Sequence, residues 1–237
     1  MRRSSCRRRR RRIDILGDSH RMPMAANRSP QDALRLAGLD SVSRETIARL
    51  ERFVALVEEW NPVHNLMSRD ETGDIWVRHI ADSAQLVAMA PSAARWLDIG
   101  SGGGFPGVVV ACLVADRPNA VVHLVESNSR KVAFLRAAKR STGAPIVVHS
   151  GRIEDIVNHF ADTVDAVSAR ALASLDTLCG WIEPIVARGA VAWLHKGADF
   201  ASELADTAPR WTLDLVEHPS RIGSGVIVEI RSIERTP

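Results

Sequence analysis

An apolar run that leads directly into closely spaced glycines limits the possible folds of this chain more than any other feature. Residues 95–99 suit a strand buried on both faces of a parallel sheet, and Pro106 suits the first turn of a helix. The glycines between them can adopt positive φ and let a ligand approach the backbone beside the helix N–H groups: Gly100, Gly102 and Gly104. The stretch therefore predicts a cradle for an adenosine-bearing cofactor.

Two motifs overlap in this loop. Asp98-x-Gly100-x-Gly102-x-Gly104 is the form typical of S-adenosylmethionine (SAM) binding, whereas Gly102-x-Gly104-x-x-Gly107 matches the dinucleotide pattern G-x-G-x-x-G. A single match to the second pattern is weak evidence. The loop alone leaves both cofactors open, and a glycine-rich turn without a ligand is the least favoured alternative.

Charge is distributed unevenly along the chain. Residues 1–28 hold ten arginines and two aspartates, a local charge of +8, so the whole-chain value of +3 leaves −5 for residues 29–237. An RNA-binding surface on this body must therefore be a local patch. The segment 1–28 lacks hydrophobic periodicity, which predicts a disordered extension. We favour a misassigned start over an RNA-binding arm or a targeting segment.

Other features of the sequence indicate a soluble protein of the cytoplasm with no membrane partner. No apolar run reaches the roughly 18 residues of a membrane helix, and the start has no apolar signal-peptide core. The three cysteines are too scattered for a disulfide framework. The eight histidines form no close pair, so no metal is expected.

The hydrophobic pattern changes near residue 93. Before it, helical spacing predicts a small N-terminal helical cap over 29–92, with helices at 30–37, from Ser43 to Trp60 with Pro62 ending it, and at 75–89. After it, strands and helices alternate over 93–237, which predicts an α/β domain with a parallel sheet. We expect strands at 95–99, 120–125, 145–149, 164–168, 190–194, 211–217 and 225–231, and helices at 106–115, 129–141, 153–159, 174–187 and 199–206.

The last two predicted strands are separated only by residues 219–225, too few for a helix, so they should pair as an antiparallel hairpin. This ending is similar to the seven-stranded sheet of class I SAM-dependent methyltransferases, with their Rossmann-like α/β fold. A nicotinamide-binding sheet would normally be wholly parallel. The hairpin therefore favours SAM.

Polar residues follow the first five strands, and ligands bind beyond the carboxyl ends of such strands. We expect Glu126 to accept hydrogen bonds from a cofactor ribose, and Ile153 and Glu154 to flank an adenine. The alternatives are an acid near a helix N-cap for Glu126 and a solvated acid in a first helical turn for Glu154. Asp98 can hydrogen-bond the loop amides, meet the ammonium group of a methionine moiety, or do both. Arg170 suits a cofactor carboxylate or an RNA phosphate, with a surface ion pair as the alternative.

The chain closely resembles the bacterial small-subunit ribosomal RNA methyltransferase G family, also called glucose-inhibited division protein B. The resemblance covers about residues 60–197 and is carried by Trp60-Asn61-x-x-x-Asn65-Leu66, Arg78-His79-Ile80-x-Asp82-Ser83, Asp98-Ile99-Gly100-Ser101-Gly102-x-Gly104-Phe105-Pro106-Gly107, Arg130-Lys131-x-x-Phe134-Leu135-Arg136, Gly151-Arg152-Ile153-Glu154, Ser168-Ala169-Arg170-Ala171 and Lys196-Gly197. Gly103 stands where others have alanine or proline, a difference that we expect to matter little.

The resemblance implies methyl transfer from SAM to N7 of a guanine in 16S ribosomal RNA, of the guanine-527 type, in a loop near the decoding centre. It implies cofactor contacts from Gly100, Phe105, Ile153, Glu154 and Arg170. Guanine N7 carries a lone pair and no proton, so its attack needs no general base and orientation can supply catalysis. No catalytic residue is therefore assigned.

The RNA contacts that we expect are basic residues of the cap, of the helix after the second strand and of the fifth strand: Arg78, His79, Arg130, Lys131, Arg136, Lys139, Arg140 and Lys196. A solvated helix face is the alternative for at least half of them. The expected partner is 16S RNA, or the small subunit or its precursor, with a monomeric enzyme. The alternative functions are an NAD(P)-dependent oxidoreductase and a non-catalytic RNA-binding protein with a relict cofactor fold.

Overall fold

The computed structural model describes residues 29–67 and 74–236. The predicted disorder of residues 1–28 lies outside the described residues. Within them, no helix is both long enough and apolar enough to cross a membrane.

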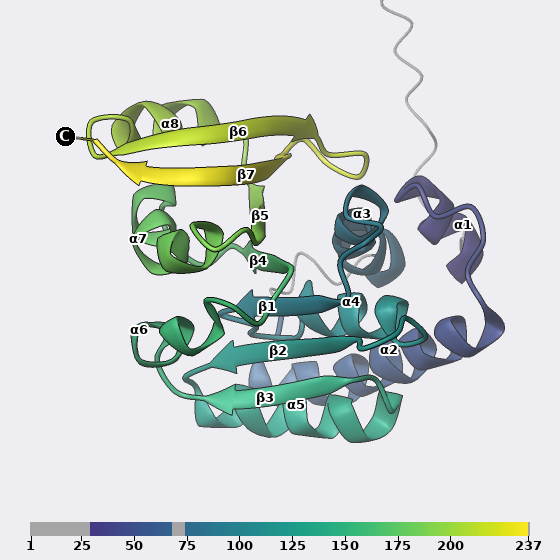
Figure 1. Cartoon of the computed structure of the whole chain (residues 1–237). Coiled ribbons are helices and arrows are strands. Elements are labelled where there is room, and N and C mark those ends of the chain that lie inside the picture. The colour runs from purple at the N-terminus through teal and green to yellow at the C-terminus, as the bar shows by residue number, and fades with distance from the viewer. Residues whose placement is uncertain (1–28, 68–73, 237) are drawn as a thin grey trace, which may run out of the picture.

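A seven-stranded sheet with the order β3-β2-β1-β4-β5-β7-β6 forms the centre of the structure (Figure 1). The first five strands pair in parallel, and β7 runs antiparallel to both β5 and β6. The predicted hairpin and seven strands are thus confirmed. Their bounds are β1 Arg95–Ile99, β2 Val121–Glu126, β3 Ile146–Ser150, β4 Ala166–Arg170, β5 Val191–Lys196, β6 Trp211–Pro219 and β7 Val226–Arg235.

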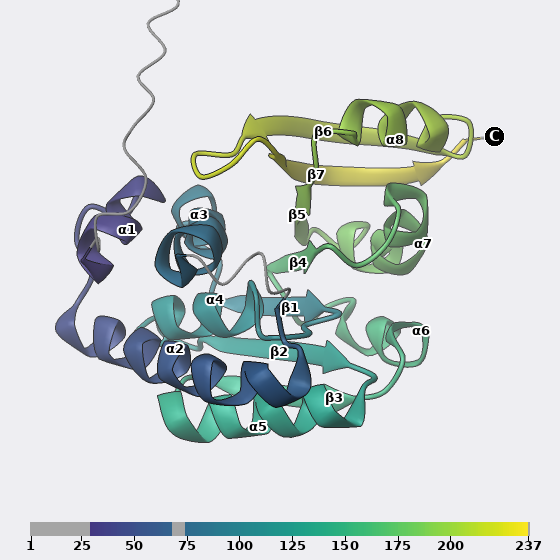
Figure 2. The ribbon, with the colours of Figure 1, turned by 180° about the vertical axis from the view of Figure 1, so that it is seen from behind.

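Helices cover both faces of this sheet, as Figures 1 and 2 show from opposite sides. One face is covered by α2 (Arg44–His64), α4 (Gly107–Val114) and α5 (Ser129–Thr142), and the other by α6 (Ile153–Ile156), η3 (Val157–Phe160), α7 (Leu175–Val186) and α8 (Phe200–Thr207). Because β1 is buried on both faces, its residues divide between the two cores: Trp96 joins the first, and Leu97 and Ile99 join the second. The central position of β1 places its carboxyl end deep within the molecule.

The N-terminal helices share one core with α4 and α5. They are α1 (Pro30–Leu36), α2, the π-helical turn η2 (Trp76–Ala81) and α3 (Asp82–Met89). Serines cap the first two helices, since Ser29 Oγ accepts from the Asp32 N–H at 3.2 Å and Ser43 Oγ accepts from the Thr46 N–H at 3.1 Å. The division into a cap over 29–92 and a domain over 93–237 stays a prediction.

Pro62 does not end α2, which continues to His64 and stops at Asn65, a residue with a left-handed φ of 45°. A proline removes one hydrogen bond, to the carbonyl four residues earlier. That residue, Glu58, is exposed, so water can replace the lost bond.

Two other predicted helices also differ from regular α-helix. The one predicted over 75–89 contains the π turn η2, and the one predicted over 153–159 is divided into α6 and η3. Hydrophobic spacing does not distinguish these tighter and wider turns from an α-helix.

Candidate active site

The loop after β1 is held in place by hydrogen bonds that its backbone N–H groups donate. Gly102 has a φ of 51°, and a Cβ atom built there would meet no atom closer than 3.7 Å. Glycine is therefore required at position 102 by conformation and not by packing. Glu126 at the end of β2 fixes the loop, since its Oε2 accepts from the Gly102 N–H at 2.9 Å and its Oε1 from the Asn128 N–H at 2.7 Å.

Packing, by contrast, requires two glycines that follow Gly102 toward α4. A Cβ on Gly104 would lie 2.7 Å from Val108 Cγ2 and 3.0 Å from Phe53 Cζ. A Cβ on Gly107 would lie 2.5 Å from Asp98 Oδ2. Gly104 therefore lets α2 and α4 pack closely against the loop, and Gly107 lets α4 pack against β1 and β2, so the structure gives Gly104 a packing role beside the cofactor contact that the sequence predicted.

Asp98 lies beneath the loop and not in the open site, because it is only 1% exposed. Its Oδ1 accepts a hydrogen bond of 2.7 Å from Ser168 Oγ on β4. Burial raises the pKa of this carboxyl to about 6. This position fits the structural role expected for Asp98, and its direct contact with a cofactor ammonium stays a prediction.

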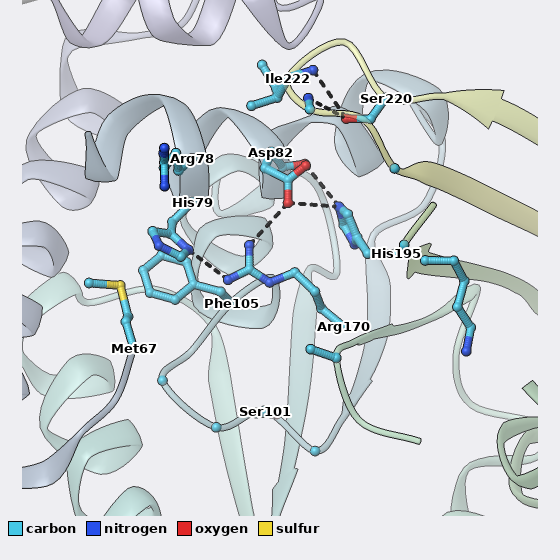
Figure 3. A pocket seen from close by; sticks show the side chains of 18 of the residues that line it. Met67, Arg78, His79, Asp82, Ser101, Phe105, Arg170, His195, Ser220 and Ile222 are labelled. Atoms are coloured by element: carbon cyan, nitrogen blue, oxygen red, sulfur yellow. Dashed lines mark hydrogen bonds and ion pairs between the residues drawn. The ribbon is translucent and has the colours of Figure 1, made fainter. Parts of the chain in front are cut away.

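A cavity of about 970 Å³ opens at the carboxyl ends of the strands, next to the loop. Since β1 pairs with β2 on one side and β4 on the other, this is the point where the strand order reverses and where α/β sheets bind ligands. One end of the cavity is the glycine loop, and the other is the turn between β6 and β7. Figure 3 shows side chains from η2, α3, β4 and β5 pointing into it.

Arg170 at the end of β4 joins the sheet to the N-terminal helices (Figure 3). Its guanidinium donates to Asp82 Oδ2 at 3.1 Å and contacts His79 Nδ1 at 2.7 Å. It also lies over the Phe105 ring, 5.5 Å from the centroid. Because the arginine is always charged, it donates in these contacts, and His79 Nδ1 accepts.

Several predicted site residues line this cavity. From the predicted cofactor set they are Gly100, Gly102, Phe105 and Arg170, and from the predicted RNA set they are Arg78, His79, Lys131 and Lys196. Lys131 is near the cofactor loop, since a Cβ on Gly102 would lie 3.9 Å from its Nζ. Lys196 donates to Glu203 at 3.0 Å and to the Ala173 carbonyl at 3.1 Å, so it is held in an ion pair and not presented to solvent.

The remaining predicted residues lie around the cavity. Glu126 is 9% exposed behind the loop, while Ile153 and Glu154 begin α6, which follows β3 along the chain. Four basic residues are exposed on α5, outside the cavity: Arg130, Arg136, Lys139 and Arg140.

Asp82 and His195 also line the cavity, and the sequence assigned no role to either. Asp82 begins α3, and His195 lies at the end of β5 with its Nε2 at 3.1 Å from the Asp82 carbonyl oxygen. Burial lowers the pKa of His195, so its ring is neutral and donates to this carbonyl. Both residues lay in segments that the sequence singled out, Asp82 within Arg78–Ser83 and His195 at a strand end, but only the fold brings them together.

The sheet order, the antiparallel β7 and the glycine loop at the switch point define the fold of the class I SAM-dependent methyltransferases. The chain is similar to a Podospora anserina methyltransferase solved with S-adenosylhomocysteine bound (TM-score 0.56, 14% identity, 89% of this chain and 98% of that one). It is also similar to the O-methyltransferase TomG from Streptomyces achromogenes, solved with SAM (TM-score 0.53, 15% identity, 85% and 96% covered).

The chain belongs to the GidB family, described as rRNA small subunit methyltransferase G, whose model matches residues 46–224. It is 51% identical over 203 residues to the ribosomal RNA small subunit methyltransferase G of Bradyrhizobium diazoefficiens, covering 86% of this chain and 77% of that one. The protein of the same name from Bradyrhizobium sp. ORS 278 is 48% identical, with 89% and 96% covered. The predicted family, methyltransferase fold and SAM cofactor are confirmed, which disfavours the NAD(P) alternative.

Proposed function

We propose that this chain methylates N7 of a guanine in 16S ribosomal RNA, in the loop near the decoding centre. The observation that carries the proposal is one continuous cavity, which runs from the glycine loop to the β6–β7 turn and is lined by Arg78, Lys131 and Arg170. Such a cavity can hold a cofactor at one end and a nucleotide of an anionic polymer at the other.

The residues around the loop fit SAM. The backbone at Gly102 lines the cavity with open space where a Cβ would lie, whereas a Cβ on Gly100 would collide with the Leu172 side chain; Phe105 lines the cavity as well. Glu126 uses one acceptor position of each oxygen for the backbone, which leaves others for ribose hydroxyls. Ile153 and Glu154 are proposed to flank the adenine, and Arg170 to approach the methionine carboxylate. SAM, when bound, supplies an electrophilic methyl group.

The chain's task in such a reaction is orientation. N7 of guanine has an in-plane lone pair and no proton to remove, so the residues need only hold the base with this edge toward the methyl group. In RNA loops, bases can be unstacked and presented to a protein in this way. We therefore assign no general base.

The exposed basic residues of α5 are proposed to contact RNA phosphates. Arg130, Arg136, Lys139 and Arg140 form a local cationic patch on a body with a net charge of −5 over residues 29–237. Phosphate contacts position a protein on RNA without reading its sequence. Arg78 and His79 at the cavity are closer to the reacting base. We further propose that the enzyme acts as a monomer in the cytoplasm, where its ribosomal partner is assembled.

The test is methyl transfer from radiolabelled SAM to small ribosomal subunits that lack the modification, followed by mass mapping of the labelled nucleotide. We expect 7-methylguanosine in the decoding-region loop. Label on another nucleotide contradicts the acceptor assignment, and absence of both label and SAM binding contradicts the enzymatic proposal itself.

A matched variant locates the cofactor. Gly102→Val places a β-branched residue at a φ of 51° beside open space, so we expect a folded protein whose SAM affinity falls at least about tenfold. Isothermal titration measures the affinity, and circular dichroism checks the fold. Unchanged SAM affinity in the folded variant contradicts placement of the cofactor at this loop.

A further inference from the structure

Asp82 is the only acidic side chain among the described residues that line the main cavity. The other charged lining residues are basic: Arg78, Lys131, Arg170 and Lys196. A carboxylate is not needed to attract RNA and repels its phosphates. Its presence in a cationic cavity therefore calls for a ligand group that donates hydrogen bonds.

The Asp82 carboxylate is held firmly and still has acceptor capacity. Its Oδ1 accepts from Gln85 Nε2 at 3.1 Å, and its Oδ2 accepts from Arg170 Nη1 at 3.1 Å. The side chain remains 18% exposed. Since a carboxylate can accept about four hydrogen bonds, roughly two positions remain available, although His195 Nε2 also lies 3.6 Å from Oδ2.

The place of Asp82 within the cavity separates it from the cofactor loop. His195 contacts its carbonyl from β5, and Gln85, which holds the carboxylate, also donates to Ser220 Oγ of the β6–β7 turn at 3.2 Å. Asp82 thus belongs to the end of the cavity formed by β5 and that turn (Figure 3). The two carboxylates nearer the loop lie beneath and behind it, where Asp98 Oδ1 accepts from Ser168 and Glu126 accepts from two backbone amides.

Guanine presents two neighbouring donors, N1–H and the 2-amino group, on the edge used for Watson–Crick pairing. The other RNA bases present no such pair of adjacent donors. A carboxylate can accept both donors at once, and the charge-assisted bonds are strong. N7 lies on another edge of the purine, so these two hydrogen bonds leave N7 accessible. Methylation at N7 also gives the base a positive charge, which a nearby carboxylate stabilises.

We propose that Asp82 selects guanine by accepting hydrogen bonds from N1–H and the 2-amino group of the acceptor base, and that Arg170 and Gln85 keep its carboxylate in the required orientation. This inference rests on the proposed function, because it concerns the acceptor base of the same reaction.

The experiment compares guanine with inosine, which lacks the 2-amino group, at the methylated position of a fluorescent rRNA fragment or a reconstituted subunit. Two quantities are measured for each RNA: kcat/KM for methyl transfer, and binding by fluorescence anisotropy without SAM. For the unmodified protein we expect a preference for guanine of about tenfold or more in both. For Asp82→Asn we expect the preference for guanine over inosine to fall toward unity. The SAM affinity of this variant should stay within about twofold of that of the unmodified protein.

Asp176→Asn is the matched control. Asp176 is also a half-buried carboxylate bound to an arginine and a second side chain, Arg210 and Trp211, but it lies on α7 away from the cavity. Its replacement should leave the preference for guanine unchanged.

The outcomes separate the two proposals. If the unmodified protein methylates guanine but does not distinguish it from inosine in either measurement, the inference is overturned whatever the variants do. If Asp82→Asn lowers binding and kcat/KM equally for both RNAs, Asp82 acts only by positioning Arg170, and the inference is again overturned. If the unmodified protein transfers no methyl group to guanine, the proposed function fails, and this inference fails with it.

Discussion

At the scale of single residues, glycines that share a positive φ can be required for different physical reasons. Gly102 and Gly104 both have positive φ, but only at Gly104 would a Cβ collide with neighbouring side chains. Gly103 also has a packing constraint, since a Cβ there would lie 2.8 Å from the Leu66 carbonyl oxygen. The sequence-based expectation that Gly103 is readily exchanged for alanine therefore overlooks the segment around Leu66.

Gly104→Ala should destabilise the protein by about 2–4 kcal/mol, because it adds overpacking to the cost of positive φ. Gly143→Ala is the control: its φ is also positive, at 64°, but no atom lies within 4 Å of the added Cβ. In the control, the free energy of unfolding should fall by only about 1–2 kcal/mol, the cost of placing alanine at a positive φ. Urea unfolding measures both, and equal losses contradict a packing role for Gly104.

Asp98 should make stability fall as pH rises from about 4 to about 6. Burial raises its pKa in the folded protein to about 6 from the ordinary value of 3.8. Between these values the unfolded chain releases the proton and the folded chain keeps it, so ionisation favours unfolding by roughly 3 kcal/mol in total. Asp98→Asn should remove this contribution from the pH dependence of unfolding. An identical slope in the two proteins contradicts a raised pKa.

At the scale of elements, α5 combines two roles on opposite faces. Its apolar side is buried through Phe134 and Leu135, with the Phe134 ring 5.7 Å from the Trp60 ring of α2, while its basic residues remain exposed. Arg52 of α2 holds the end of this helix by donating to the Ser141 and Thr142 carbonyls. The π turn η2 is a second element with a functional consequence, because it precedes α3 and carries Arg78 and His79 to the cavity.

Replacing Arg136 and Arg140 together by alanine should weaken RNA binding about tenfold or more and reduce the slope of log K against log salt by about 1.4, since each lost phosphate contact contributes about 0.7. Stability should change by less than about 0.5 kcal/mol because both side chains are exposed. Anisotropy titrations over a range of salt measure the slope. Arg188→Ala, at an exposed ion pair elsewhere, is the control; a similar loss there contradicts an α5 interface.

At the scale of the whole molecule, the N-terminal helices and the sheet are joined at the cavity by a few polar contacts between distant segments. Arg170 of β4 bonds Asp82 of α3, and His195 of β5 bonds the same residue. Binding and folding are thus coupled, since the groups that line the cavity also hold its two sides together.

Arg170→Ala should destabilise the protein by about 2–3 kcal/mol, because it leaves the half-buried Asp82 without its charged partner. Arg188→Ala breaks the exposed pair with Asp162 and should cost less than about 1 kcal/mol. Thermal and urea unfolding compare the two. If the Arg170 variant is as stable as the Arg188 variant, the link between sheet and helices contributes little.

By itself, the sequence determined the strands, their alternation with helices, the final hairpin and the position of the glycine loop. These follow from local periodicity, chain length between elements and the backbone freedom of glycine, all of which act over a few residues. The same reasoning predicted that Gly100, Gly102 and Arg170 lie at strand ends.

Only the tertiary structure decided which polar residues meet. Asp82, Arg170 and His195 are far apart in sequence, and their contacts depend on the strand order and on the π turn before α3. The tertiary structure also pairs Lys196 with Glu203 and places Asp98 beneath the loop. Sequence spacing specifies which edge of the sheet a residue occupies, but burial and pairing depend on what packs against that edge from elsewhere in the chain.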